Sequence, residues 1–114
     1  MLTTCKILYA NAKKKPFLAI SGTHGTNTAL NNVKNGVGIL MRGMDNITIV
    51  DEGHAALIEG GILNGDLMSY LWAHGKQTMT TGCDCVGYIS PILGGGHGWF
   101  QGNPSVPLES YSKF

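Results

Sequence analysis

The chain has 114 residues, which is enough for one domain of ordinary size and too few for two. Hydrophobic residues make up 43% of it, so it can form a core, but its formal net charge of +1 gives no electrostatic reason to expect binding to nucleic acid or to a membrane surface. Its three cysteines are an odd number, which argues against a disulfide framework.

No targeting segment or membrane span is evident in the sequence. Apolar runs stay well short of the ~18 residues that a membrane-spanning helix needs. Near the N-terminus the charged residues follow the apolar ones, which is the reverse of their order in a secretory signal. The sequence therefore assigns no compartment to the protein.

The first predicted elements are a helix and a strand. Thr3 or Thr4 is a candidate cap for the helix, and Pro16 ends it. Apolar residues at helical spacing predict one buried stripe: Cys5, Leu8, Tyr9 and Ala12. The apolar run 17–20 predicts a short buried strand, and it leads into the loop 21–32, which is rich in Gly, Thr and Asn. A strand that opens into a glycine-containing loop is where α/β proteins bind ligands.

Short strands are predicted next, over residues 37–41, 47–50 and 55–58. A tight turn at 42–46 separates the first two, and residues 51–54 form a hairpin-like connection between the others. The alternation of short apolar runs with Gly, Asp and Asn is typical of strands joined by turns.

A second helix and a last strand complete the predicted elements. Asn64 is expected to cap this helix, Asp66 lies favourably in its first turn, and Gly75 ends it. The predicted apolar face consists of Leu67, Met68, Leu71 and Trp72. Residues 77–81 predict a strand that runs directly into Cys83.

These elements predict an α+β fold of about five short mixed strands and two helices. Residues 103–114 show no periodicity and predict an irregular tail. Because no predicted element follows Gly102 to pack against the loop before it, we expect residues 1–102 to form an incomplete domain.

Residues 82–102, GCDCVGYISPILGGGHGWFQG, stand out by composition. Three consecutive glycines and a fourth at Gly98 leave backbone N–H groups uncovered, as a polyanionic or planar ligand requires. An ordinary flexible loop is the alternative. A second turn that combines glycine and histidine, SGTHGT at 21–26, favours ligand binding.

Two residues in these loops are candidates for chemistry. His24 lies between small residues at a loop tip, where a neutral imidazole can contact a ligand or act as a nucleophile. Cys83 directly follows the predicted strand, where a thiolate would be accessible, although a buried and inert thiol is the alternative. His97 could touch a ligand or only cap a turn.

Other site classes find little support in the sequence. Cys83 and Cys85 form CxC, which lacks the second pair that zinc knuckles use, so a metal site with His97 is a weaker option. There is no Ser-His-Asp order, no paired-carboxylate motif and no GxxxxGK[ST] sequence, and hydrolase and nucleotide-triphosphatase functions therefore lack support.

Three segments carry a resemblance to a known family: SGTHG at 21–25, RGMDNITIVDEGHAALIEGG at 42–61, and LWAHGKQTMTTGCDCVGYISPILGGGHGWFQG at 71–102. Together they resemble the FAD-linked oxidases that have a vanillyl-alcohol-oxidase-type, or PCMH-type, FAD-binding domain. The berberine-bridge-enzyme-like flavoproteins are the most similar subgroup. The resemblance covers about Cys5 to Gly102.

The resemblance implies FAD as the cofactor and suggests roles for two sets of residues. The first loop would bind the pyrophosphate through backbone N–H groups and hydroxyls: Ser21, Gly22, Thr23, His24, Gly25 and Thr26. The second would lie along the cofactor: Cys83, Val86, Gly87, Gly94, Gly95, Gly96 and Gly98. His24 matches the histidine that many members attach to the flavin 8α-methyl group, and Cys83 the cysteine that bicovalent members attach at C6.

For activity, the resemblance implies an oxidase in which flavin takes a hydride from an organic substrate and passes electrons to O2. Family members are several times longer, and their substrate-binding domain with its catalytic base has no counterpart in this chain. Thr23 stands where glycine is common, and Pro91 where histidine is frequent. We therefore expect the first part of an FAD-binding domain, or alternatively a non-catalytic remnant or interaction fragment without cofactor.

Overall fold

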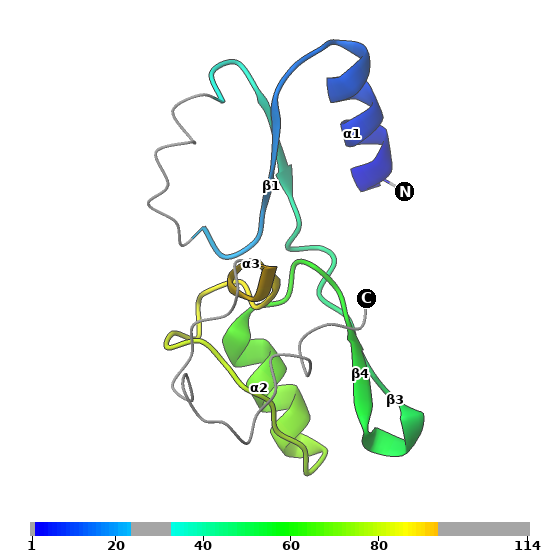
Figure 1. Ribbon diagram of the computed structural model, residues 1–114, viewed down its shortest axis with the longest axis vertical. Coiled ribbons are helices and arrows are strands. Elements are labelled where there is room, and N and C mark those ends of the chain that lie inside the picture. Colours follow the sequence, from blue (N-terminus) through cyan, green and yellow to red (C-terminus); the bar gives the residue numbers. More distant parts are fainter. Residues whose placement is uncertain (1, 24–32, 94–114) are drawn as a thin grey trace.

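The computed structural model describes residues 2–23 and 33–93. Figure 1 shows them in two groups, with α1, β1 and β2 in one and β3, β4, α2 and α3 in the other. No helix in these residues is long and apolar enough to cross a membrane. In chain order the elements are α1 (Leu2–Ala12), β1 (Phe17–Ile20), β2 (Val37–Leu40), β3 (Ile47–Val50), the 3-10 turn η2 (Asp51–Gly53), β4 (Ala55–Ile58), α2 (Asn64–Ala73) and α3 (Ile89–Leu93).

The first group is built on a parallel pair of strands. β1 and β2 pair from Phe17 opposite Val37 to Ile20 opposite Leu40, and α1 packs beside β2. The strand predicted at 17–20 is confirmed, but its burial is not, because exposed and half-buried residues alternate along it. Within the described residues β1 has a single neighbouring strand, so much of its surface stays uncovered.

The predicted buried stripe of α1 is wrong. Cys5, Leu8, Tyr9 and Ala12 are all exposed, and Ala10 is the buried residue among positions 4–12 of this helix, whose burial the structure describes. Apolar residues are spread around the helix, so spacing alone does not select one face, and the small Ala10 lets the backbone pack closely. The helix already includes Thr3 and Thr4, so neither residue caps it.

The second group contains the predicted hairpin. β3 and β4 pair antiparallel from Ile47 opposite Ile58 to Val50 opposite Ala55, which confirms both strands and their connection. The turn between them places Glu52 in the left-handed region at φ 53°, an uncommon conformation for a residue other than glycine.

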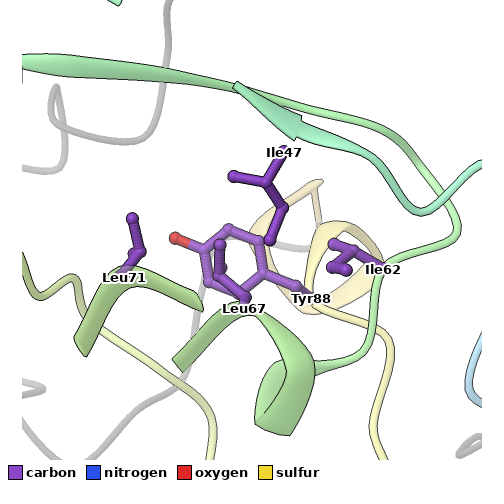
Figure 2. Close-up of a cluster of buried hydrophobic side chains, with 5 residues drawn as sticks. All are labelled: Ile47, Ile62, Leu67, Leu71 and Tyr88. Carbon is purple, nitrogen blue, oxygen red and sulfur yellow. The ribbon is translucent and has the colours of Figure 1, made fainter. Parts of the chain in front are cut away.

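The core lies between this hairpin, α2 and the start of α3. Figure 2 shows its five buried side chains, with the ring of Tyr88 in the middle: Ile47, Ile62, Leu67, Leu71 and Tyr88. Leu67 and Leu71 are one helical turn apart on α2, so one face of this helix is buried as predicted. The predicted face was too wide, because Met68 and Trp72 are exposed.

Two further elements differ from the sequence prediction. Residues 77–81 form no strand, because their polar groups bond elsewhere: the Thr81 carbonyl accepts a hydrogen bond from the Asn64 side chain, and the Thr78 hydroxyl lies 3.3 Å from the Tyr88 hydroxyl. The short helix α3 was not predicted. Pro91 lies in its first turn, where a missing N–H costs no helical hydrogen bond.

Candidate functional site

The chain leaves β1 through Ser21, Gly22 and Thr23, which we call the SGT turn. The Met41 N–H donates to the Ile20 carbonyl at 2.8 Å, and strand pairing ends there. Thr23 has a left-handed backbone with φ 53°. The N–H groups of Gly22 and Thr23 donate no hydrogen bond to any other residue that the structure describes.

Residues 81–88, which we call the cysteine loop, are joined to the start of α2 by hydrogen bonds. The Asn64 N–H donates to the Val86 carbonyl at 2.9 Å, and the Gly65 N–H donates to the Asp84 carbonyl at 3.0 Å. The first N–H groups of a helix have no partner within the helix, so these loop carbonyls satisfy them. The cysteine loop is therefore fixed on the end of α2.

The SGT turn and the cysteine loop touch each other backbone to backbone. A Cβ atom built on Gly22 would collide with the Gly87 nitrogen and lie 2.7 Å from the Cys85 carbonyl oxygen. A Cβ atom on Gly87 would in turn collide with the Ser21 hydroxyl. Only glycine fits at both positions, and the two loops form a single edge of the protein.

The beginning of α3 also reaches this edge, as Figure 1 shows where β1 turns toward the second group. The Ser21 and Ser90 hydroxyl oxygens are 3.5 Å apart. Val86 and Gly87 are buried beneath the edge, whereas the side chain of Cys83 is exposed. The edge thus combines a hydroxyl with N–H groups that have no partner among the described residues, and the exposed Cys83 thiol belongs to the same loop.

The cysteines in the described residues are free and exposed. Within the same part of the chain, no group of three or more His, Cys, Asp and Glu side chains could hold a metal ion. An exposed thiol beside a glycine-lined edge is a chemically competent nucleophile once it is deprotonated.

The structure brings together six of the predicted site residues in these two loops: Ser21, Gly22, Thr23, Cys83, Val86 and Gly87. The remaining predicted residues lie outside the described residues: His24, Gly25, Thr26, Gly94, Gly95, Gly96 and Gly98. His97 and the predicted tail at 103–114 lie outside them too.

Sequence analysis did not predict the role of Asn64. It was expected to cap α2, but Leu63 is the N-cap residue, and no side chain caps the helix there. The Asn64 side chain instead donates hydrogen bonds to the carbonyls of Thr81 and Cys83. The sequence carried only a weak signal for this contact, because an Asn at a helix start fits a cap equally well.

The described part of the edge has hydrogen-bond donors that suit the phosphates of a cofactor. Unpaired N–H groups and the Ser21 hydroxyl are donors suited to phosphate oxygens, and they need no lysine or arginine. The close approach of Gly22 to the cysteine loop puts these donors and the Cys83 loop on one continuous surface.

Comparison with known proteins identifies the family. A family model described as an FAD-binding domain matches residues 6–106. The chain is 42% identical over 111 residues to an FAD-linked oxidoreductase, chry5, of Gibberella zeae, a match that spans 97% of this chain and 22% of that protein. It is 44% identical over 96 residues to FAD-linked oxidoreductase chyH of Penicillium rubens, covering 84% of this chain and 19% of the other.

A solved structure has a similar fold. The crystal structure of 6-hydroxy-D-nicotine oxidase from Arthrobacter nicotinovorans matches with a TM-score of 0.70 and 28% identity, over 86% of this chain and 21% of the oxidase chain. The chain thus spans about a fifth of the length of each of these relatives. Both loops, and the strand β1 that leads into the first of them, lie within the matched family segment, and the chain belongs to the FAD-binding domain family of FAD-linked oxidoreductases.

Proposed function

We propose that this chain supplies the FAD-binding elements of an FAD-dependent oxidase of the berberine-bridge-enzyme-like subgroup. The observation that carries the proposal is the contact between Gly22 and the cysteine loop, which joins the two candidate cofactor loops into one edge. FAD itself supplies the redox chemistry: it accepts a hydride from an organic substrate and passes two electrons to O2, giving hydrogen peroxide.

In this proposal the SGT turn and the residues after it bind the pyrophosphate. The N–H groups of Gly22 and Thr23 and the Ser21 hydroxyl donate hydrogen bonds to phosphate oxygens, and His24, Gly25 and Thr26 extend the same loop. Val86 and Gly87 support the flavin side of the edge, and Gly94, Gly95, Gly96 and Gly98 leave space for the ring to lie against the backbone.

The proposal includes two covalent attachments, through His24 to the flavin 8α-methyl carbon and through Cys83 to flavin C6. At Cys83 one sulfur–carbon bond forms, and the thiol hydrogen and the ring hydrogen are lost. Both hydrogens leave as protons, the flavin retains two electrons, and O2 accepts these to form hydrogen peroxide. The exposed side chain of Cys83 supports this assignment, since the reacting sulfur must be accessible.

The test is binding of FAD to the purified chain. Ligand that binds only the native state raises stability, by about 2.7 kcal/mol at a free concentration of 100 times Kd. We expect FAD to raise the unfolding midpoint, and acid precipitation to leave flavin attached to the protein. Cys83→Ala should remove one attachment, and Cys5→Ala, at an exposed thiol on α1, should remove neither.

Two outcomes would contradict this proposal. The first is a chain that is folded by circular dichroism but retains no flavin and shows no shift in midpoint. The second, for the site assignment alone, is a flavin adduct that survives both His24→Ala and Cys83→Ala unchanged.

A second candidate function is an interaction fragment without cofactor. Large apolar side chains on the described surface favour it: Trp72 is 78% exposed and Leu93 is 70% exposed. Such side chains favour an interface only where they form a contiguous apolar patch. Analytical ultracentrifugation distinguishes the two functions, because self-association that is unaffected by FAD supports the second and a monomer that binds FAD supports the first.

A further inference from the structure

Asn64 is the one described polar residue whose side chain lies fully inside the protein. It is 0% exposed, at the first position of α2. Burying an amide without hydrogen bonds costs on the order of 2–7 kcal/mol, so a buried Asn needs partners. Its Nδ2 atom has two: it donates to the Thr81 carbonyl at 2.9 Å and to the Cys83 carbonyl at 3.3 Å.

These two bonds lie next to the backbone bonds from the same helix end, and the Cys83 carbonyl also accepts from the Val86 N–H, at 3.4 Å. Asn64 and Gly65 donate their N–H groups to Val86 and Asp84, and the Asn64 side chain holds the two carbonyls just before them. The start of α2 therefore contacts the cysteine loop at four carbonyls in a span of six residues. Among these contacts, the one at the Cys83 carbonyl comes from the Asn64 side chain.

Asparagine suits this position for a specific chemical reason. Its amide group carries two N–H hydrogens, one for each carbonyl, whereas an aspartate in the same place has none. The Oδ1 atom of Asn64 is buried and has no hydrogen-bond partner among the described residues. An unsatisfied oxygen reduces the net stability that this residue provides, so stability alone does not account for an amide at this position.

We propose that Asn64 is the positioning residue of the cysteine loop, and that it directs the Cys83 thiol toward the proposed flavin site at the edge formed by this loop and the SGT turn. This inference rests on the proposed function, because it assigns Cys83 as the attachment residue. A carbonyl held in one direction fixes the peptide plane that follows Cys83 and so restricts where its Cα–Cβ bond points. Asn64 acts through Cys83 and does not touch the reacting atoms.

The experiment compares the wild-type chain with two variants. Asn64→Asp keeps the side-chain shape and removes both donated hydrogen bonds. Ile39→Val removes one methylene at a buried position on β2, outside the core cluster that contains Tyr88, with an expected cost of about 0.5–1.5 kcal/mol. It controls for loss of stability, and all three proteins are compared at equal folded fraction.

One measurement uses FAD and the other does not. Peptide mass spectrometry gives the fraction of flavin attached at Cys83 and at His24, where each attachment forms one bond to flavin carbon and O2 takes up the two electrons and two protons released. Hydrogen–deuterium exchange gives the protection of residues 81–88 in the absence of FAD. Cys5, exposed on α1, is the unattached reference thiol in the same molecule.

We expect Asn64→Asp to lower attachment at Cys83 by at least about tenfold, because misplacement by an ångström costs up to about a hundredfold in a positioned reaction. Attachment at His24 should stay within about twofold of the wild type, since the described hydrogen bonds of the Asn64 side chain go to the cysteine loop and not to the SGT turn. Exchange should rise in residues 81–88 for Asn64→Asp only, and Ile39→Val should match the wild type in both measurements.

The other possible results distinguish failure of the positioning role from failure of the proposed function. Equal attachment at Cys83 in Asn64→Asp and wild type overturns the positioning role while FAD binding stands. Equal losses at both sites in both variants indicate a general structural effect and overturn it too. If the wild type takes up no FAD, the proposed function fails, and exchange decides the positioning role: a rise confined to Asn64→Asp supports it, and no such rise overturns it.

Discussion

Replacement of Gly22 by alanine tests the contact between the two loops directly. The new Cβ atom would meet the Gly87 nitrogen, the Cys85 carbonyl oxygen and the Val86 carbonyl carbon, the last two at 2.7 Å. Real Cβ atoms essentially never come within 3.0 Å of other heavy atoms, so something must move. All three atoms belong to the backbone, and the loop that carries them is fixed to α2 by hydrogen bonds.

The destabilisation by Gly22→Ala depends on how far the backbone around Gly22 can move. Adding a methylene to a well-packed core costs about 1–3 kcal/mol, because flexible side chains can move aside. At Gly22 the atoms in the way belong to the backbone, so the cost should be at the upper end, near ~3 kcal/mol. A domain of this size has a total stability of about 5–15 kcal/mol. The variant should thus lose a substantial part of its free energy of unfolding, and about 10–20 °C in its midpoint.

Gly43→Ala is the matched control, because a Cβ atom at Gly43 meets no atom within 4 Å and its backbone is not left-handed. We expect it to change stability by less than about 0.5 kcal/mol. Urea unfolding followed by circular dichroism measures both variants. Such comparisons resolve differences of about 1 kcal/mol. If the free energies of unfolding of Gly22→Ala and Gly43→Ala differ by less than about 1 kcal/mol, the two loops are not in the described contact.

Three further predictions concern single residues. Thr23→Gly should raise the free energy of unfolding by up to about 1.5 kcal/mol, and with it the urea midpoint, because a left-handed backbone costs a threonine about 1–2 kcal/mol and glycine's greater chain entropy offsets about 0.5–1 kcal/mol. A lower midpoint would contradict this. Leu67→Ala, at a fully buried position, should lower the free energy of unfolding by about 2–5 kcal/mol in the same assay. Met68→Ala, at the neighbouring exposed position, should lower it by less than about 1 kcal/mol. Similar costs for the two variants would refute the described core. Burial raises the pKa of Tyr88 above 10.0, by more than its hydrogen bond to Thr78 lowers it, so the wild type should lose stability as pH rises through that folded-state pKa. Tyr88→Phe should remove this part of the pH dependence. If the free energy of unfolding falls with pH equally in the wild type and in Tyr88→Phe above about pH 10, the ordinary tyrosine pKa, Tyr88 does not contribute to it.

Local sequence predicted most of the strands because their signals are local. The hairpin at 47–58 has two β-branched or apolar runs and a connection rich in Asp, Glu and Gly, and nothing distant is needed to form it. The strand at 17–20 follows a proline and ends at a Gly-containing turn, which fixes both of its ends. Which faces are buried depends on distant elements, and the wrong stripe on α1 reflects this.

The candidate site depended more on residues that are far apart in the chain. The resemblance identified Gly22 and Gly87 as site residues, but their contact depends on two loops from opposite halves of the sequence. Asn64 bonds to carbonyls 17 and 19 residues later, and a local pattern at a helix start cannot tell such a partner from a cap. The strand wrongly expected at 77–81 has the same cause, because the end of that segment bonds to Asn64 and not to a neighbouring strand.

The site and the core are one structural unit, because Gly87 and Tyr88 are consecutive. Gly87 contacts the SGT turn, and the next residue places its ring at the centre of the core (Figure 2), where it packs with Ile47, Ile62 and two leucines of α2. The Tyr88 N–H also donates to the Ile62 carbonyl at 3.1 Å. A ligand that holds Gly22 against Gly87 therefore stabilises the core as well, and local opening of the core loosens the edge. FAD binding and global stability should thus change together in core variants, whereas loop variants such as Asn64→Asp should separate them.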